Sequence, residues 1–297
     1  MTTSRASFAV PLALFSLLSL APGCSGQTGK VTVHLKDAPA DVTAAVVTIT
    51  EIDLVGSGGV TVLSTTRTTT DLLSLANDTA TLVKDVEVPV GTYAQLRFVI
   101  SGGYVEAGGV IYASSPTYEG LPSESTAGGT LRMPSYAQSG LKVDLPGGAT
   151  VVGAGSTVLL VDFDVSQSFG QEAGGSGAWV MHPVVKATGF ELAGTVNVTM
   201  KLASGVTLPA PTTLADFKAV LTPAPPASGG NTILALTSTD ATTYGASFKY
   251  LFPGDYTLTF NAPSAVNAFA TTPPVPSNVT VTSGQATAAS FVLSSAH

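Results

Sequence analysis

The chain has 297 residues, a single cysteine and a formal net charge of −7, and only 10% of its residues are charged. A net negative chain with so few cations disfavours nucleic acid or an anionic membrane surface as a partner, because both need a basic face. Globular proteins usually carry about a quarter charged residues, so this composition favours an exported protein rich in β-strands. The lone cysteine excludes an internal disulfide.

The first 23 residues have the layout of a signal peptide. Arg5 precedes thirteen uncharged residues, Phe8–Leu20, which read FAVPLALFSLLSL. A helix of that length is about 20 Å long, shorter than the ~30 Å hydrocarbon core of a bilayer. No later apolar run approaches the length of a membrane-spanning helix. We therefore predict a secretory signal peptide over residues 1–23 and a mature chain outside the cytoplasm.

Cys24 stands at the end of this segment, directly after Ala21-Pro22-Gly23. The arrangement resembles the bacterial lipobox, in which a small residue precedes a cysteine whose sulfur receives diacylglycerol. The resemblance implies acyl chains such as palmitate on Cys24, a short tether over residues 24–29 and a membrane as partner. Ser25 after the cysteine implies the outer membrane, where the source has two membranes. The alternative is an ordinary signal peptide with an unmodified, reactive cysteine near its cleavage site.

Alternating apolar and polar residues predict β-strands along the rest of the chain. In KVTVHLKD, for example, Val31, Val33 and Leu35 occupy every second position. Only TDLLSLAN at 70–77 is predicted to form a helical turn. The strand pattern pauses near residues 189–194 and then restarts. We predict an all-β fold with two consecutive antiparallel β-sandwich domains, residues 30–189 and 194–297.

Two turns repeat the same local design. VPVGTYAQLRFVI at 88–100 and FPGDYTLTF at 252–260 each place Pro and Gly before a Tyr and a strong strand. Pro presets one backbone dihedral and Gly permits a positive φ, so the chain reverses sharply at each of the two turns. We expect the rings of Tyr93 and Tyr256 to pack back over these turns.

Six motifs occur in order in the first unit: LKDAP, DLLSLAN, VPVGTYAQLRFVI, LRMPSYAQSGLKVDL, VLLVDFDVSQSF and WVMHPVVKA. Together they resemble the domain-of-unknown-function family numbered 4382 over residues 30–189. The resemblance implies a β-sandwich outside the cytoplasm and transfers no catalytic residue. The second unit is similar to carboxypeptidase-regulatory or transthyretin-like sandwiches through FKYLFPGDYTLTF and VTVTSGQATAASFVL, which implies a spacer or binding module.

Two carboxylates are the strongest candidates for metal chemistry. In LLVDFDVS, strand periodicity puts Asp162 and Asp164 on one face, about 7 Å apart. Hard oxygen ligands at this spacing suit calcium, with Asp144 or Asp37 as further donors. The simpler interpretation is that the pair forms a wet strand face or caps a turn. A metal-assisted hydrolase using Asp162 and Asp164 stays an alternative function.

The segment 102–140 is the predicted ligand surface. It combines tyrosines with an arginine among flexible residues, and such tyrosines suit sugars or protein partners. The candidate residues are Tyr104, Tyr112, Tyr118, Tyr136 and Arg132. No catalytic constellation is present in the sequence, so we predict a non-catalytic binding or adhesion module on a lipid anchor, with a carbohydrate or envelope protein as ligand. A purely structural component of an envelope complex is the other alternative.

Overall fold

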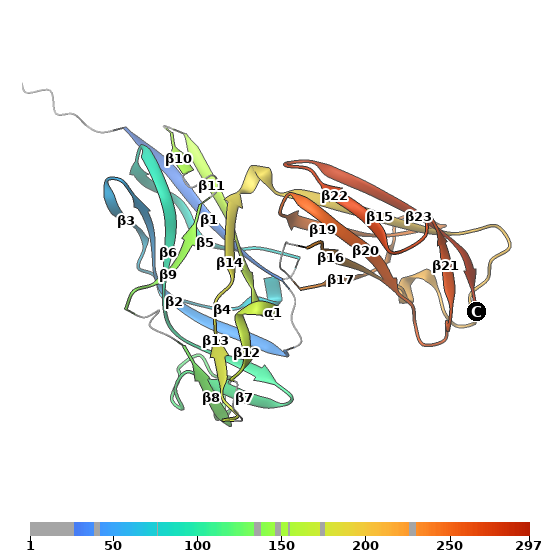
Figure 1. Cartoon of the computed structure of the whole chain (residues 1–297), viewed down its shortest axis with the longest axis horizontal. Helices are drawn as coiled ribbons and strands as arrows, with labels where there is room; N and C mark the ends of the chain where they lie inside the picture. Colours follow the sequence, from blue (N-terminus) through green and yellow to red (C-terminus); the bar gives the residue numbers. More distant parts are fainter. Residues whose placement is uncertain are drawn as a thin grey trace, which may run out of the picture.

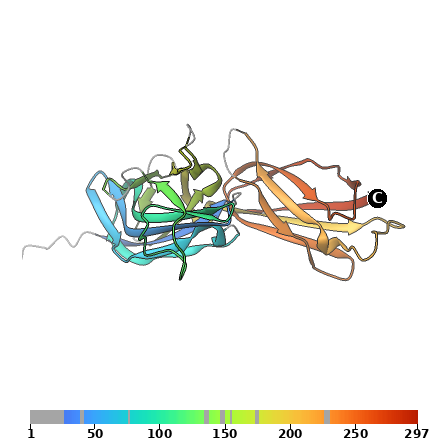
Figure 2. The same ribbon diagram turned by 90° about the horizontal axis from the view of Figure 1, so that it is seen from below.

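The computed structural model describes residues 27–38, 42–75, 77–133, 138–145, 150–153, 155–172, 176–225 and 230–297. The predicted signal peptide and Cys24 lie outside the described residues, and so does Tyr136. Figures 1 and 2 show an elongated molecule made of an N-terminal and a C-terminal unit arranged end to end.

The N-terminal unit contains two sheets. One sheet has the strand order β14-β11-β1-β5, and the other follows the path β12-β13-β8-β7-β6-β2-β3 with β4, β9 and β10 attached to β2 or β6. In chain order the strands are β1 Thr28–Ala38, β2 Ala44–Gly56, β3 Gly59–Ser64, β4 Thr68–Asp71, β5 Ala80–Pro89, β6 Gly91–Ala107, β7 Val110–Ala113, β8 Gly129–Arg132, β9 Leu141–Asp144, β10 Thr150–Val152, β11 Ser156–Asp164, β12 Phe169–Gln171, β13 Trp179–Met181 and β14 Val185–Gly189.

The C-terminal unit is a smaller pair of sheets, with strand orders β18-β19-β15-β23-β21 and β17-β16-β20-β22. Its strands are β15 Gly194–Leu202, β16 Lys218–Pro223, β17 Thr232–Ala235, β18 Thr237–Ser238, β19 Thr243–Leu251, β20 Gly254–Asn261, β21 Phe269–Thr272, β22 Ser277–Val281 and β23 Ala286–Ala296. Each unit encloses a hydrophobic core of its own, the second one built around Phe217 and Phe248.

Among the described residues, helical structure is limited to single turns. These are η1 Leu72–Leu75, α1 Val165–Ser168, η3 Phe190–Leu192 and η4 Leu214–Asp216. The turn η1 falls inside the TDLLSLAN segment. Within the described part of the chain, no helix has the length and apolarity needed to cross a membrane. The all-β, sandwich-type prediction is thus confirmed.

Strand direction differs from the prediction in one respect. The sandwiches are not purely antiparallel, because β1 pairs in parallel with β11 and β15 pairs in parallel with β23. In each unit the first strand lies beside a strand from much later in the chain, reached after the chain has crossed to the other sheet. A half-buried strand alternates in the same way in either direction, so periodicity cannot reveal this pairing.

In both tyrosine turns the side chain packs back as predicted, but the predicted positive φ is found at Gly254 (φ 149°) and not at Gly91. The Tyr93 hydroxyl donates to the Pro89 carbonyl at 2.8 Å, and the Tyr256 hydroxyl donates to the Phe252 carbonyl at 2.9 Å. Each ring therefore fastens a strand to the turn four residues before it.

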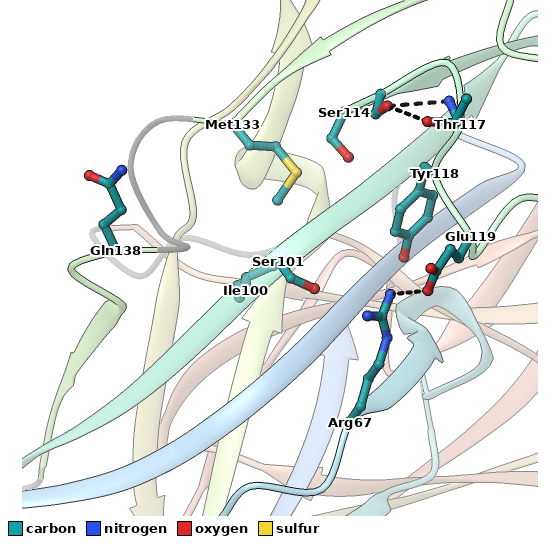
Figure 3. Close-up of a pocket in the computed structure, with 10 residues that line it drawn as sticks. Arg67, Ile100, Ser101, Ser114, Thr117, Tyr118, Glu119, Met133 and Gln138 are labelled. Carbon is teal, nitrogen blue, oxygen red and sulfur yellow. Dashed lines mark hydrogen bonds and ion pairs between the residues drawn. The ribbon is translucent and has the colours of Figure 1, made fainter.

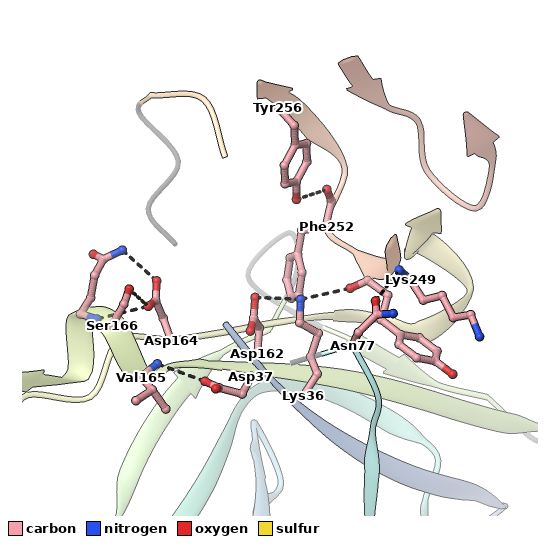
Figure 4. Close-up of polar contacts among 12 residues, drawn as sticks. Lys36, Asp37, Asn77, Asp162, Asp164, Val165, Ser166, Lys249, Phe252 and Tyr256 are labelled. Carbon is pink, nitrogen blue, oxygen red and sulfur yellow. Dashed lines mark hydrogen bonds and ion pairs between the residues drawn. The ribbon is translucent and has the colours of Figure 1, made fainter. Parts of the chain in front are cut away.

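A polar joint connects the two units (Figure 4). Lys36 Nζ lies 3.3 Å from Asp162 Oδ2 and donates to the Tyr250 carbonyl of the C-terminal unit at 3.3 Å. The same ammonium lies 5.7 Å from the centre of the Phe252 ring.

The side-chain amide of Asn77 bridges two backbone groups of β19. It donates to the Ser247 carbonyl at 3.0 Å and accepts from Lys249 N at 2.9 Å. Asn77 thus binds β19 as a neighbouring strand would.

Candidate functional site

An open pocket of about 550 Å³ lies on the N-terminal unit (Figure 3). Strand β6 forms its floor, and the turn after β7 supplies most of its polar wall. Its lining residues are Arg67, Ile100, Ser101, Ser114, Ser115, Thr117, Tyr118, Glu119, Met133 and Gln138. Hydroxyl groups, one amide and one ion pair dominate this lining, so the pocket can offer many hydrogen bonds to a polar ligand.

Tyr118 is held in one position at the wall of the pocket. Its side chain is buried, and its hydroxyl shares a 2.6 Å hydrogen bond with Thr48 Oγ1, which in turn lies 2.8 Å from Thr69 Oγ1. A Cβ at Gly102 of β6 would lie 2.8 Å from the Tyr118 ring, so the ring can approach the sheet only because that residue is glycine. Burial raises the pKa of Tyr118, while the hydrogen bond with Thr48 opposes the shift.

The turn between β7 and Tyr118 presents preset hydroxyl groups. Ser115 Oγ accepts from Thr117 N and shares a hydrogen bond with Thr117 Oγ1, both at 3.2 Å. Ser114 Oγ accepts from Gly103 N of β6 at 3.1 Å, which ties the turn to the floor. These local bonds fix the hydroxyl positions before any ligand arrives.

An exposed ion pair stands at the rim. Arg67 Nη2 lies 2.8 Å from Glu119 Oε2, and the two side chains are 50% and 78% exposed. Figure 3 shows the hydroxyl end of Tyr118 directed toward this pair. A pair this exposed contributes little to stability, because water screens it. Either partner can therefore turn to a ligand at low cost.

The structure separates the predicted ligand residues. Tyr104 is buried beside Tyr118, with ring centroids 6.4 Å apart, and burial raises its pKa. Tyr112 packs against Trp179 at 5.7 Å, while Arg132 forms an ion pair with Glu172. Tyr104 and Tyr112 lie on β6 and β7 rather than on flexible loops.

Arg67 and the hydroxyl groups of the pocket are not among the residues predicted from the sequence. Arg67 sits between β3 and β4, far from the predicted segment in the chain. The run SSPTYE at 114–119 was available as a signal, since clustered Ser, Thr and Pro mark a turn with preset hydroxyls.

The predicted metal carboxylates have protein partners. Asp162 faces Lys36 at the joint, and burial raises its pKa although the lysine opposes the shift. Asp164 is buried and caps α1, accepting from Gln167 N at 3.2 Å and from Ser166 Oγ at 2.6 Å. In the described ranges, no three His, Cys, Asp or Glu side chains gather in a way that could hold a metal ion. Calcium binding by Asp162 and Asp164 stays a prediction without a ligand set.

The family model described as "Domain of unknown function (DUF4382)" matches residues 28–183. No match was found among curated proteins.

Solved structures give distant similarities. A putative cell adhesion protein of Bacteroides fragilis is 7% identical, covering 89% of this chain and 93% of its own, with a TM-score of 0.25. A minor pilin of Streptococcus agalactiae is 10% identical, covering 89% of this chain and 95% of its own, with a TM-score of 0.24. A leucine-rich repeat protein of Bacteroides thetaiotaomicron is 14% identical over 90% of this chain, with a TM-score of 0.23, but the match spans only 26% of its length. TM-scores this low do not establish a shared fold.

Proposed function

The chain belongs to the DUF4382 family of domains of unknown function, and we propose that it is a non-catalytic binding module held outside the cytoplasm by a lipid on Cys24. The observation that carries the binding role is the open, hydroxyl-lined pocket beside Tyr118, with the exposed Arg67–Glu119 pair at its rim. The sequence layout of residues 1–25 supports the anchor.

A carbohydrate is the ligand class that best suits this pocket. Sugar hydroxyls both donate and accept, and the pocket offers hydroxyls, a guanidinium, a carboxylate and an amide for them. The partly buried Met133 supplies an apolar contact for the C–H face of a sugar, beside the nearly covered side chains of Ile100 and Tyr118. The alternative ligand is a polar protein segment, which would use the same groups.

The same proposal divides the chain into two domains, residues 30–189 and 194–297. The second domain, by its transthyretin-like motifs, would act as a spacer. Mass spectrometry of the mature N-terminal peptide tests the anchor, since we expect it to begin at Cys24 and to carry acyl chains. A mature chain that begins elsewhere, or a bare Cys24, would contradict this part of the proposal.

Binding is tested on a glycan array followed by calorimetric titration of the mature protein with the retained sugar. We expect Arg67→Ala to weaken binding by roughly tenfold or more, because a charge-assisted hydrogen bond is lost. Arg132→Ala is the matched control, since Arg132 also forms an exposed ion pair on this unit but lies outside the pocket.

Equal binding by both variants would place the ligand elsewhere. If no glycan is retained while an envelope protein is captured through the same Arg67-dependent surface, the ligand is a protein. If the parent protein binds neither a glycan nor an envelope protein, the pocket has no binding role.

A further inference from the structure

The end of the N-terminal unit near Gln27 is formed by two turns that meet. Val90 N, between β5 and β6, donates to the Gln27 carbonyl at 2.8 Å. The β2–β3 turn lies against the same region, because a shallow groove of about 200 Å³ is lined by Ser57–Gly59 and Thr61 together with Pro89–Tyr93. We call this end, residues 56–62 and 88–93 around Gln27, the Gln27 pole. The start of β1 lies at this end of the molecule, and the C-terminal unit lies at the other (Figures 1 and 2).

The surface of the Gln27 pole is uncharged and combines exposed valines with neutral polar residues such as Ser57 and Thr92. Val60, Val62 and Val90 are 52%, 49% and 38% exposed. Neither turn contains a charged residue, and the first charges next to it are the register partners Lys30 and Glu87. Val90 lines the groove, whereas Val60 and Val62 alternate with Thr61 on β3 and lie on the other side of that strand. Single exposed valines are normal on a protein surface, so the position of these three on the uncharged end next to Cys24 is what marks them.

We propose that the Gln27 pole rests on the lipid bilayer, with Val60, Val62 and Val90 in the interfacial region. This inference rests on the proposed lipid at Cys24. Two residues, Ser25 and Gly26, separate Cys24 from Gln27, and the three Cα–Cα steps between them span at most about 10 Å. The head-group layer on each side of a bilayer is itself about 5–8 Å thick. A pole held so close to the acyl chains has to face the bilayer surface.

The charge of the protein fits this kind of contact. A chain with a net charge of −7 gains nothing from electrostatic attraction to anionic lipids, so its contact has to be apolar. Three partly exposed valines are too few to bind a membrane alone, and they act only once the lipid has brought them there. Because β1 leads from this pole to Lys36 at the joint, the C-terminal unit is displaced from the bilayer by about the length of nine strand residues, roughly 30 Å.

The test uses the full chain, processed in its own host and reconstituted into phosphatidylcholine vesicles. Val90→Cys and Val60→Cys are labelled with a polarity-sensitive fluorophore, since an acylated Cys24 leaves the new thiol as the only free one. Val292→Cys is the matched control, because Val292 on β23 is also 38% exposed but belongs to the C-terminal unit. Vesicles with and without a nitroxide-bearing lipid report the depth of each label.

We expect blue-shifted emission and several-fold stronger nitroxide quenching at positions 60 and 90 than at position 292. If the protein floats with the vesicles while all three labels stay water-like, the bilayer contact is refuted and the anchor stands. If the protein does not float, the anchor and the contact both fail. If the labels at 60 and 90 are already shielded without vesicles and the protein is dimeric, a second copy covers the pole and the inference is wrong.

Discussion

The pocket and the joint each contain a cation paired with a carboxylate, but the two pairs differ in exposure. Arg67 and Glu119 at the pocket rim are 50% and 78% exposed, whereas Lys36 and Asp162 at the joint are 10% and 17% exposed. Water screens the first pair, so its partners can exchange for a ligand. The second pair is largely removed from water, so each charge depends on the other. The same pair of charges is therefore available to a ligand in one place and connects the two units in the other.

The largest effect is expected at the joint. Asp162→Ala leaves the Lys36 ammonium buried beside the Tyr250 carbonyl and the Phe252 ring without its carboxylate. We expect a loss of about 3 kcal/mol in the free energy of unfolding, since an uncompensated buried charge is costly. Urea unfolding followed by circular dichroism measures the loss.

The matched control for this variant is the double replacement Lys36→Met with Asp162→Leu. It removes both charges and should recover most of the lost stability, because an apolar pair can substitute for a buried ion pair. Ligand binding at the pocket should be unchanged in both proteins. A loss below about 1 kcal/mol for Asp162→Ala would show that water reaches Lys36, and the contrast with the rim pair would disappear.

The next effect concerns the amide bridge of the joint. Asn77→Ala removes the two hydrogen bonds to Ser247 O and Lys249 N, and we expect a loss of about 1–2 kcal/mol in the attachment of β19. Hydrogen exchange at the Lys249 amide should become faster by roughly tenfold, as that amide loses its acceptor.

Asn197→Ala serves as the control for the amide bridge. Asn197 also contacts Ser247, through a 2.8 Å hydrogen bond from the Ser247 hydroxyl, but it lies within the C-terminal unit. It should leave exchange at Lys249 unchanged. Equal protection of Lys249 in the Asn77 variant and the parent protein would mean that the two units are held together without this bridge.

At the pocket rim the effect on stability should be small. Arg67→Ala removes an exposed pair, so the free energy of unfolding should change by about 0.5 kcal/mol or less. The same urea titration that detects the Asp162→Ala loss provides the measurement. A loss as large as that of Asp162→Ala would show that Arg67 holds the turn around Tyr118 in place, and a loss of ligand binding could then no longer be assigned to direct contact.

The sequence predicts the strands and their turns far better than the pocket and the joint. Alternation identifies β1 and β11, and the spacing of Pro, Gly and Tyr identifies the turns at Tyr93 and Tyr256, because these signals are local. Strand periodicity placed Asp162 on an outward face without showing what covers that face. The partner, Lys36, is set by the parallel register of β1 and β11.

The pocket escaped prediction for the same reason. Its wall comes from four separate stretches of chain, at Arg67, Ile100–Ser101, Ser114–Glu119 and the region of Met133 and Gln138. No local pattern connects them. The cluster of tyrosines did lead to Tyr118, but the sequence does not reveal that Tyr104 and Tyr118 are both buried, at 7% and 8% exposure.

The smallest effect is a pH dependence that distinguishes two carboxylates. Asp240 precedes β19 and accepts from Thr242 N and Thr243 N at 2.8 Å each, and these bonds lower its pKa from 3.8 to about 2. Because the folded state holds the proton less tightly, Asp240 contributes stability above pH 3.8 that is lost as the pH falls toward 2. Asp162 has the opposite sign, since its raised pKa gives a contribution present below pH 3.8 and lost as the pH rises through the folded-state value. The midpoint temperature of thermal unfolding should therefore fall less steeply between pH 5 and 2 for Asp240→Asn than for the parent protein. Parallel curves of this temperature against pH would show that the hydrogen bonds of the turn do not depend on the charge of Asp240.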